Sequence, residues 1–139
     1  VSLKELGLEK IKDKVTFMQG DACNLKDIYT CFDLIFCSNL IDRLYYPQKF
    51  LDDIPSRINK DGLLVLLSPY TWLEDYTPKE NWLGGYIKDN KEVKTLDTLK
   101  ENLLVDFELL ETIDVPFVIK ETSRKYQHTI SQMSIWKKK

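Results

Sequence analysis

The sequence predicts an α/β fold built on a mostly parallel β-sheet. Apolar runs of strand length alternate along the chain with segments of helical periodicity, and such an order pairs strands in parallel through right-handed crossovers. The runs at 32–37 and 63–67 are apolar without alternation, as expected for strands that are covered on both faces. Two final strand-like segments, 117–120 and 126–136, predict an antiparallel hairpin at the edge of the sheet.

The composition is that of one globular domain. The chain has 139 residues, of which 43% are hydrophobic, enough for a core of its own. A formal net charge of -2 gives no long-range attraction for nucleic acid or an anionic membrane. No apolar run reaches membrane-spanning length, and the three cysteines lack paired spacing, so we expect a cytoplasmic protein without disulfides. One histidine and no Cys-x-x-Cys pair do not provide a metal site.

The first thirty residues predict three short elements. Leucine spacing from Leu3 onward predicts the end of a helix over 3–11. Residues 15–18 predict a short strand. Asn24 stands where it would cap a short helix over 25–30.

The middle of the chain predicts two helices around the most apolar strand. A helix over 47–59 begins at a proline, and Pro55 should kink or break it. A second helix is predicted over 96–104. Between the central strand and this helix lies a long polar and aromatic stretch, 69–94. Long loops in compact domains are often functional, so this stretch is the predicted substrate loop.

Polar residues follow three of the predicted strands, at 20–22, 37–39 and 68–70. In open α/β sheets, ligands bind outside the carboxyl ends of the strands. Asp21 is a short acceptor suited to an amino group such as that of adenine, and it is equally suited to cap the turn that follows.

The order and spacing of these segments resemble the second half of a class I S-adenosylmethionine (SAM)-dependent methyltransferase. The matching segments are 20–22, 32–35, 38–40 and 61–65. The resemblance implies a Rossmann-like sheet, with SAM as the cofactor. It also implies that Asp21 and Ala22 form the adenine-binding turn, and that Cys37, Ser38 and Asn39 lie beside the methionine part of the cofactor.

Two longer motifs, 68–85 and 114–129, resemble a narrower family, the carboxy-terminal 4-mercaptohistidine methyltransferase domain of ovothiol synthases. This resemblance extends from about residue 14 to residue 137. It implies methyl transfer from SAM to an imidazole nitrogen of 5-thiohistidine, a small-molecule substrate, in ovothiol biosynthesis. In the family, iron-dependent sulfoxide synthase domains precede this domain.

Aromatic residues of the 69–94 loop suit such a reaction, which depends mainly on alignment and exclusion of water. Tyr70, Trp72 and Trp82 are candidate substrate contacts, with Gly84 and Gly85 as a hinge. Aromatic rings can face a sulfonium cation or stack on an imidazole. The alternative is that the tryptophans only cover the sheet.

A zwitterionic amino acid also needs charged partners. Arg124 or Lys125 can pair with its carboxylate, and Glu74 or Glu80 with its amine. Asn81 belongs to the same motif and is a further candidate for substrate binding. For each of the charged candidates, an ordinary surface charge is the more common role of such a residue.

His128 and Tyr126 are the candidate catalytic residues. His128 can accept the ring proton or orient the substrate thiolate. A lone histidine on a strand can also be structural, and the same alternative holds for Tyr126.

The chain contains no Gly-x-Gly turn. In the family, such a turn follows the first strand and approaches the cofactor closely. The sequence therefore predicts a single partial domain over 1–139, a fragment whose first strands would precede residue 1. A second copy or the absent N-terminal segment would bury the exposed sheet surface.

Two other functions stay open. One is a non-catalytic methyltransferase-like module used for interaction or assembly, which the absent glycine-rich turn favours. The other is a fragment of a dinucleotide-dependent oxidoreductase, for which no residues specific to nicotinamide chemistry are present.

Overall fold

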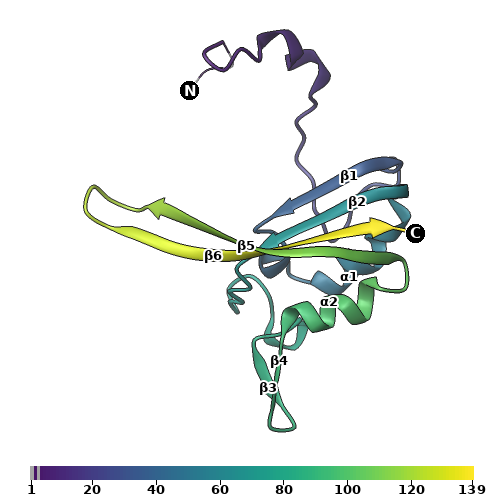
Figure 1. Cartoon of the computed structure of the whole chain (residues 1–139), viewed down its shortest axis with the longest axis vertical. Coiled ribbons are helices and arrows are strands. Elements are labelled where there is room, and N and C mark those ends of the chain that lie inside the picture. Colours follow the sequence, from purple (N-terminus) through teal and green to yellow (C-terminus); the bar gives the residue numbers. More distant parts are fainter. Residues whose placement is uncertain (1, 3) are drawn as a thin grey trace.

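A four-stranded sheet is the main element of the computed structural model, which describes residue 2 and residues 4–139 (Figure 1). Its strands are β1 (Phe32–Ser38), β2 (Ile58–Ser68), β5 (Phe107–Lys120) and β6 (Tyr126–Lys138). They lie in the order β1-β2-β6-β5. β1 and β2 are parallel, whereas β6 is antiparallel to both of its neighbours.

This topology corrects the predicted fold class. The sheet is mixed, with one parallel and two antiparallel strand pairs, and is not a mostly parallel, Rossmann-like α/β sheet. The reason is that β5 and β6 form a long hairpin that supplies half of the sheet. Apolar patterning marks where a strand lies but not the direction in which it pairs. The predicted hairpin is therefore present, but it forms two of the four strands of the sheet and is not a small addition at its edge.

The predictions for the first thirty residues are wrong. Residues 4–31 hold only turns and the 3₁₀-helix η1 (Glu9–Lys14), and residues 15–18 and 25–30 form neither the strand nor the helix. Leu3 lies outside the described residues. The start of this segment reaches away from the sheet (Figure 1), and Phe17 is 92% exposed. A strand needs a neighbour for its backbone N–H and C=O groups, and 15–18 has none.

The helices of the middle region begin close to their predicted starts, but the first is shorter than the predicted 47–59, because residues 58 and 59 lie in β2. α1 (Pro47–Asp53) begins at the predicted proline, and it gives way to the 3₁₀-helix η3 (Ile54–Ser56) at Pro55. The missing N–H of a proline explains this break. α2 (Thr95–Leu103) lies within one residue of its predicted bounds. A short 3₁₀-helix, η2 (Ile41–Arg43), follows β1.

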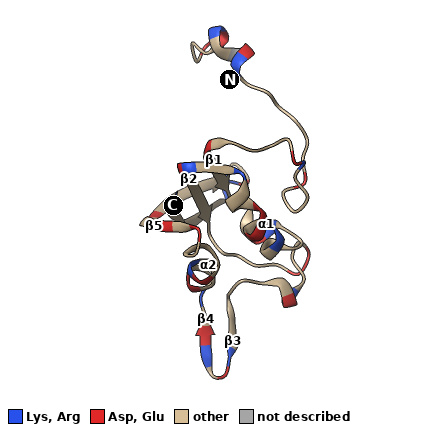
Figure 2. Cartoon of the chain, turned by 90° about the vertical axis from the view of Figure 1, so that its right-hand side faces the viewer, with Lys and Arg blue, Asp and Glu red and all other residues tan. Residues whose placement is uncertain are grey.

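The 69–94 stretch is more ordered than a loop. It contains the 3₁₀-helix η4 (Lys79–Asn81) and the antiparallel pair of β3 (Tyr86–Lys88) and β4 (Lys91–Val93). Acidic and basic side chains are interspersed on this hairpin and on α2 (Figure 2).

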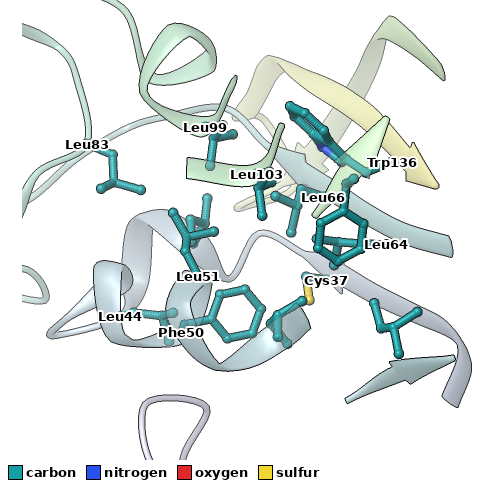
Figure 3. Packing of buried hydrophobic residues seen from close by; sticks show 14 of the residues in the cluster. Cys37, Leu44, Phe50, Leu51, Leu64, Leu66, Leu83, Leu99, Leu103 and Trp136 are labelled. Atoms are coloured by element: carbon teal, nitrogen blue, oxygen red, sulfur yellow. The ribbon is translucent and has the colours of Figure 1, made fainter. Parts of the chain in front are cut away.

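The core lies between one face of the sheet and the two α-helices. Leu64, Leu66 and Trp136 from β2 and β6 pack there with Phe50 of α1 and Leu103 of α2 (Figure 3). Burying each such side chain stabilises the fold by about 1.5–3 kcal/mol. None of the helices in the described part of the chain is long and apolar enough to cross a membrane.

The opposite face of the sheet is not covered by these helices. Leu34 and Phe36 of β1 are 55% and 57% exposed, and they pair with Leu63 and Val65 of β2. Ile113 of β5 is exposed on the same face. Exposed apolar surface of this kind often marks an interaction site.

Candidate functional site

The carboxyl ends of β1 and β2 carry two residues in the left-handed backbone region. Asn39 has a φ of 50° and Tyr70 a φ of 53°. The Asn39 N–H donates to the Leu67 carbonyl at 2.7 Å, and the Ser131 hydroxyl donates to Asn39 Oδ1 at 3.3 Å. Left-handed non-glycine residues are uncommon and often occur at functional sites. These strand ends are therefore a candidate functional site.

A cavity of about 600 Å³ opens beyond the end of β2, a volume typical of small-molecule sites. Its wall includes Tyr70 from the loop after β2, Thr95 at the start of α2, Asp114 from β5 and Gln132 from β6. Strand pairing explains this convergence, since Gln132 lies opposite both Ser68 of β2 and Asp114.

The charge of this cavity is mainly negative. Glu92, Asp97 and Asp114 line it together with one basic residue, Lys94. Such a lining favours a ligand with a positively charged group, such as an amine.

A buried carboxylate, Asp42, holds the turn beside this cavity, and we did not predict it from the sequence. Asp42 is 1% exposed. Its Oδ1 accepts from the Ser68 hydroxyl at 2.8 Å, and its Oδ2 accepts from the Thr71 N–H at 3.0 Å and from Arg43 at 2.9 Å. Beside the adjacent Arg43, Asp42 looks like one half of a pair of surface charges. The only sign of its burial in the sequence is that apolar residues, Ile41 and Leu44, flank this pair.

Asp21 forms a local turn and contacts a tyrosine. Its Oδ1 accepts from the Cys23 N–H at 2.9 Å, and its Oδ2 accepts from the Tyr45 hydroxyl at 3.0 Å. This hydrogen bond raises the pKa of Tyr45, because the phenol must keep its proton to donate. Each carboxylate oxygen still has a further lone pair, so the turn does not exclude a ligand.

Ala22 lies at a second, mainly apolar cavity of about 380 Å³. This cavity lies between the 18–29 segment, β1 and α1, and Ile35, Cys37, Leu40 and Phe50 line it as well. Its apolar walls suit a flat aromatic group.

The other predicted cofactor residues have different environments. Cys37 is buried in the core, and burial raises the pKa of its thiol to about 11. Ser38 is exposed at the end of β1. Asn39 accepts from Ser131 of β6. Of the three, only Cys37 lines the apolar cavity.

The two tryptophans of the substrate loop pack against each other, and Trp72 also contacts the first residue of α2. The two ring centroids are 6.4 Å apart. Trp72 Nε1 donates to Thr95 Oγ1 at 3.0 Å, and Trp82 Nε1 donates to the Thr77 carbonyl at 2.8 Å. Gly84 is buried, and a Cβ there would lie 2.3 Å from the Thr95 nitrogen. In this arrangement the two tryptophans predicted as substrate contacts and Gly84 of the predicted hinge are packed against neighbouring residues.

The predicted charged contacts lie outside the 600 Å³ cavity. Glu74 and Glu80 are exposed on the substrate loop, and Asn81 donates to the Tyr45 carbonyl at 3.0 Å. Arg124 lies in the turn between β5 and β6, and the neighbouring Lys125 forms an ion pair with Glu121.

Tyr126 and His128 lie on the part of the β5–β6 hairpin that projects past the end of β2 (Figure 1). His128 is four residues before Gln132, about 14 Å along the strand. Strand alternation puts both candidates on the face of β6 that carries Gln132, although neither lines the cavity. Within the described residues, no three His, Cys, Asp or Glu side chains are grouped as a metal site requires.

No protein-family model matches the chain, and no curated protein does. Among solved structures, the chain is similar to a protein described with the conversion of a disulfide bond into a thioacetal group during echinomycin biosynthesis. The TM-score is 0.60 at 10% sequence identity, over 96% of this chain. The chain spans 62% of the length of that protein. At this identity the similarity shows a shared fold and does not transfer an activity.

Proposed function

We propose that this chain acts in a SAM-dependent N-methyltransferase whose acceptor is 5-thiohistidine. One observation carries the proposal. The two long motifs that resemble the ovothiol family, 68–85 and 114–129, are distant in sequence but meet at the 600 Å³ cavity, where Tyr70 and Asp114 share a wall. Motifs that bind one ligand together must meet in this way.

Two features of the 20–22 turn support a place for the adenine part of SAM. Asp21 retains lone pairs for the adenine amino group, and Ala22 borders the apolar cavity of about 380 Å³ that would take the ring. When bound, SAM supplies a methyl group on a sulfonium, so that a ring nitrogen forms the new N–C bond while the C–S bond breaks and S-adenosylhomocysteine leaves.

The 600 Å³ cavity, called the acceptor cavity below because it would hold the methyl acceptor, offers charged groups for a zwitterionic amino acid. Asp114 is suited to the ammonium group and Lys94 to the carboxylate, in place of the surface charges Glu80 and Arg124. The imidazole ring must lose one proton overall, because the nitrogen that attacks needs a free lone pair and methylation leaves the ring with an additional positive charge. His128 remains the candidate to accept this proton, provided that the projecting hairpin folds over the cavity.

The free thiol of 5-thiohistidine is compatible with a reaction in the cytoplasm. A free thiol persists in a reducing cytoplasm, where we place the reaction.

Mass spectrometry of the full-length protein incubated with SAM and 5-thiohistidine tests the proposal. We expect a singly N-methylated product, and a loss of kcat/KM of about tenfold or more for Asp114→Asn, since it removes a charge-assisted contact. Glu80→Gln is the matched control, because this exposed residue lies outside the cavity. Absence of product, or equal rates in both variants, would contradict the proposal.

A second candidate function rests on the open sheet face. The exposed apolar side chains of Leu34 and Phe36 favour a non-catalytic module that binds a second copy or another polypeptide segment. A protein that self-associates through this face, and that neither binds nor methylates 5-thiohistidine, would favour this candidate over the enzyme.

A further inference from the structure

Gln132 occupies a special position in the wall of the acceptor cavity. It lies on β6 between Ser68 and Asp114, and its side chain lines the cavity. The nearby charged groups are three carboxylates and one lysine, so most of them accept hydrogen bonds. The amide of Gln132 offers an uncharged donor there, as the Thr95 hydroxyl also can.

Tyr70 orients this amide. Its hydroxyl donates to Gln132 Oε1 at 3.3 Å. Because the amide oxygen is engaged, the NH₂ group is the part of Gln132 that remains available to a ligand. Burial and the nearby Asp42 carboxylate raise the pKa of Tyr70 to about 12, so the phenol stays a donor at neutral pH.

The backbone on both sides of Tyr70 is anchored. The Tyr70 N–H donates to Ser68 Oγ at 3.0 Å, and the Ser68 hydroxyl donates in turn to Asp42. On the other side, the Thr71 N–H and hydroxyl both donate to Asp42 Oδ2. A single buried carboxylate therefore fixes the turn that carries Tyr70 in its left-handed conformation.

We propose that Gln132 is the specificity-determining residue that selects the acceptor by its sulfur, with Tyr70 as its positioning residue. The inference rests on the proposed function. The amide NH₂ donates to the sulfur of 5-thiohistidine, which the surrounding carboxylates would otherwise repel. Histidine lacks this sulfur and gains nothing from the contact, so the chain discriminates between the two amino acids.

Isothermal titration of the full-length protein with 5-thiohistidine and with histidine tests this inference. We expect 5-thiohistidine to bind at least as tightly as histidine, because the hydrogen bond from Gln132 offsets the repulsion of the sulfur by the carboxylates. Gln132→Glu keeps the size and the acceptor for Tyr70 but loses the donor. It should weaken 5-thiohistidine binding about tenfold or more and leave histidine binding within about twofold. Tyr70→Phe should cause a smaller loss that is also specific to 5-thiohistidine.

The matched control is Gln127→Glu, the same change on the same strand at an exposed position. Gln132→Met, which keeps the length without a donor, provides a second test if the glutamate variant does not fold. Equal binding of 5-thiohistidine by wild type, Gln132→Met and any folded Gln132→Glu would overturn the inference but leave the proposed acceptor in place. A wild-type protein that does not bind 5-thiohistidine would overturn both.

Discussion

Replacing Asp42 by alanine tests whether the buried carboxylate stabilises the fold. The side chain is 1% exposed and accepts four hydrogen bonds, from Ser68, from the Thr71 N–H and hydroxyl, and from Arg43. Hydrogen bonds to a charged group each contribute about 1.5–3 kcal/mol, but their losses do not simply add.

The expected cost is about 3 kcal/mol in the free energy of unfolding, the lower end of the range for breaking a buried ion pair. The lower end applies because Arg43 is one-third exposed and keeps its hydrogen bonds to Thr71, so its charge is not left buried and unpaired. The Ser68 hydroxyl, in contrast, is buried and loses its acceptor. A domain of this size is stable by only about 5–15 kcal/mol, so the loss is large.

Urea unfolding followed by tryptophan fluorescence measures this change. Asp75→Ala, at an exposed aspartate of the substrate loop, is the control and should change stability by no more than about 0.5 kcal/mol. If Asp42→Ala costs less than about 1 kcal/mol, the hydrogen bonds of this carboxylate contribute little beyond those of a surface residue, and Asp42 does not anchor the turn.

Two further predictions concern packing and thiol reactivity. Gly84→Ala places a Cβ 2.3 Å from the backbone at the start of α2, and should cost about 1–3 kcal/mol by thermal unfolding. Gly20→Ala, which meets nothing within 4 Å, should be close to neutral, and equal losses would contradict the packing argument. Ellman's reagent at pH 8 should modify the exposed Cys31 quickly and Cys37 slowly, since burial raises the pKa of Cys37 to about 11. Equal rates at both cysteines would show that the core opens easily.

The sequence was sufficient for elements whose signals are local. The apolar run at 63–67 lies within β2, and the predicted proline begins α1, because burial and the fixed φ of proline act on neighbouring residues. It failed for 15–18, which has the apolar residues of a strand but no partner in the structure. A strand forms only where another strand receives its hydrogen bonds.

The candidate site shows the same limit. Tyr70 was predicted because it follows β2, whose end is readable from the sequence, whereas the strand predicted before Asp21 does not form. Asp42, Asp114 and Gln132 were missed because their importance depends on which strands and helices become neighbours.

By itself, the sequence located strand β1, helix α2, the start of α1 and the apolar centre of β2. Only the tertiary structure decided that β6 runs antiparallel beside β2, so that the sheet is mixed and the two long motifs meet at one cavity. The physical reason is that side-chain periodicity and turn chemistry are local properties. Strand direction and the convergence of distant residues depend on hydrogen bonds and burial between segments far apart in the chain.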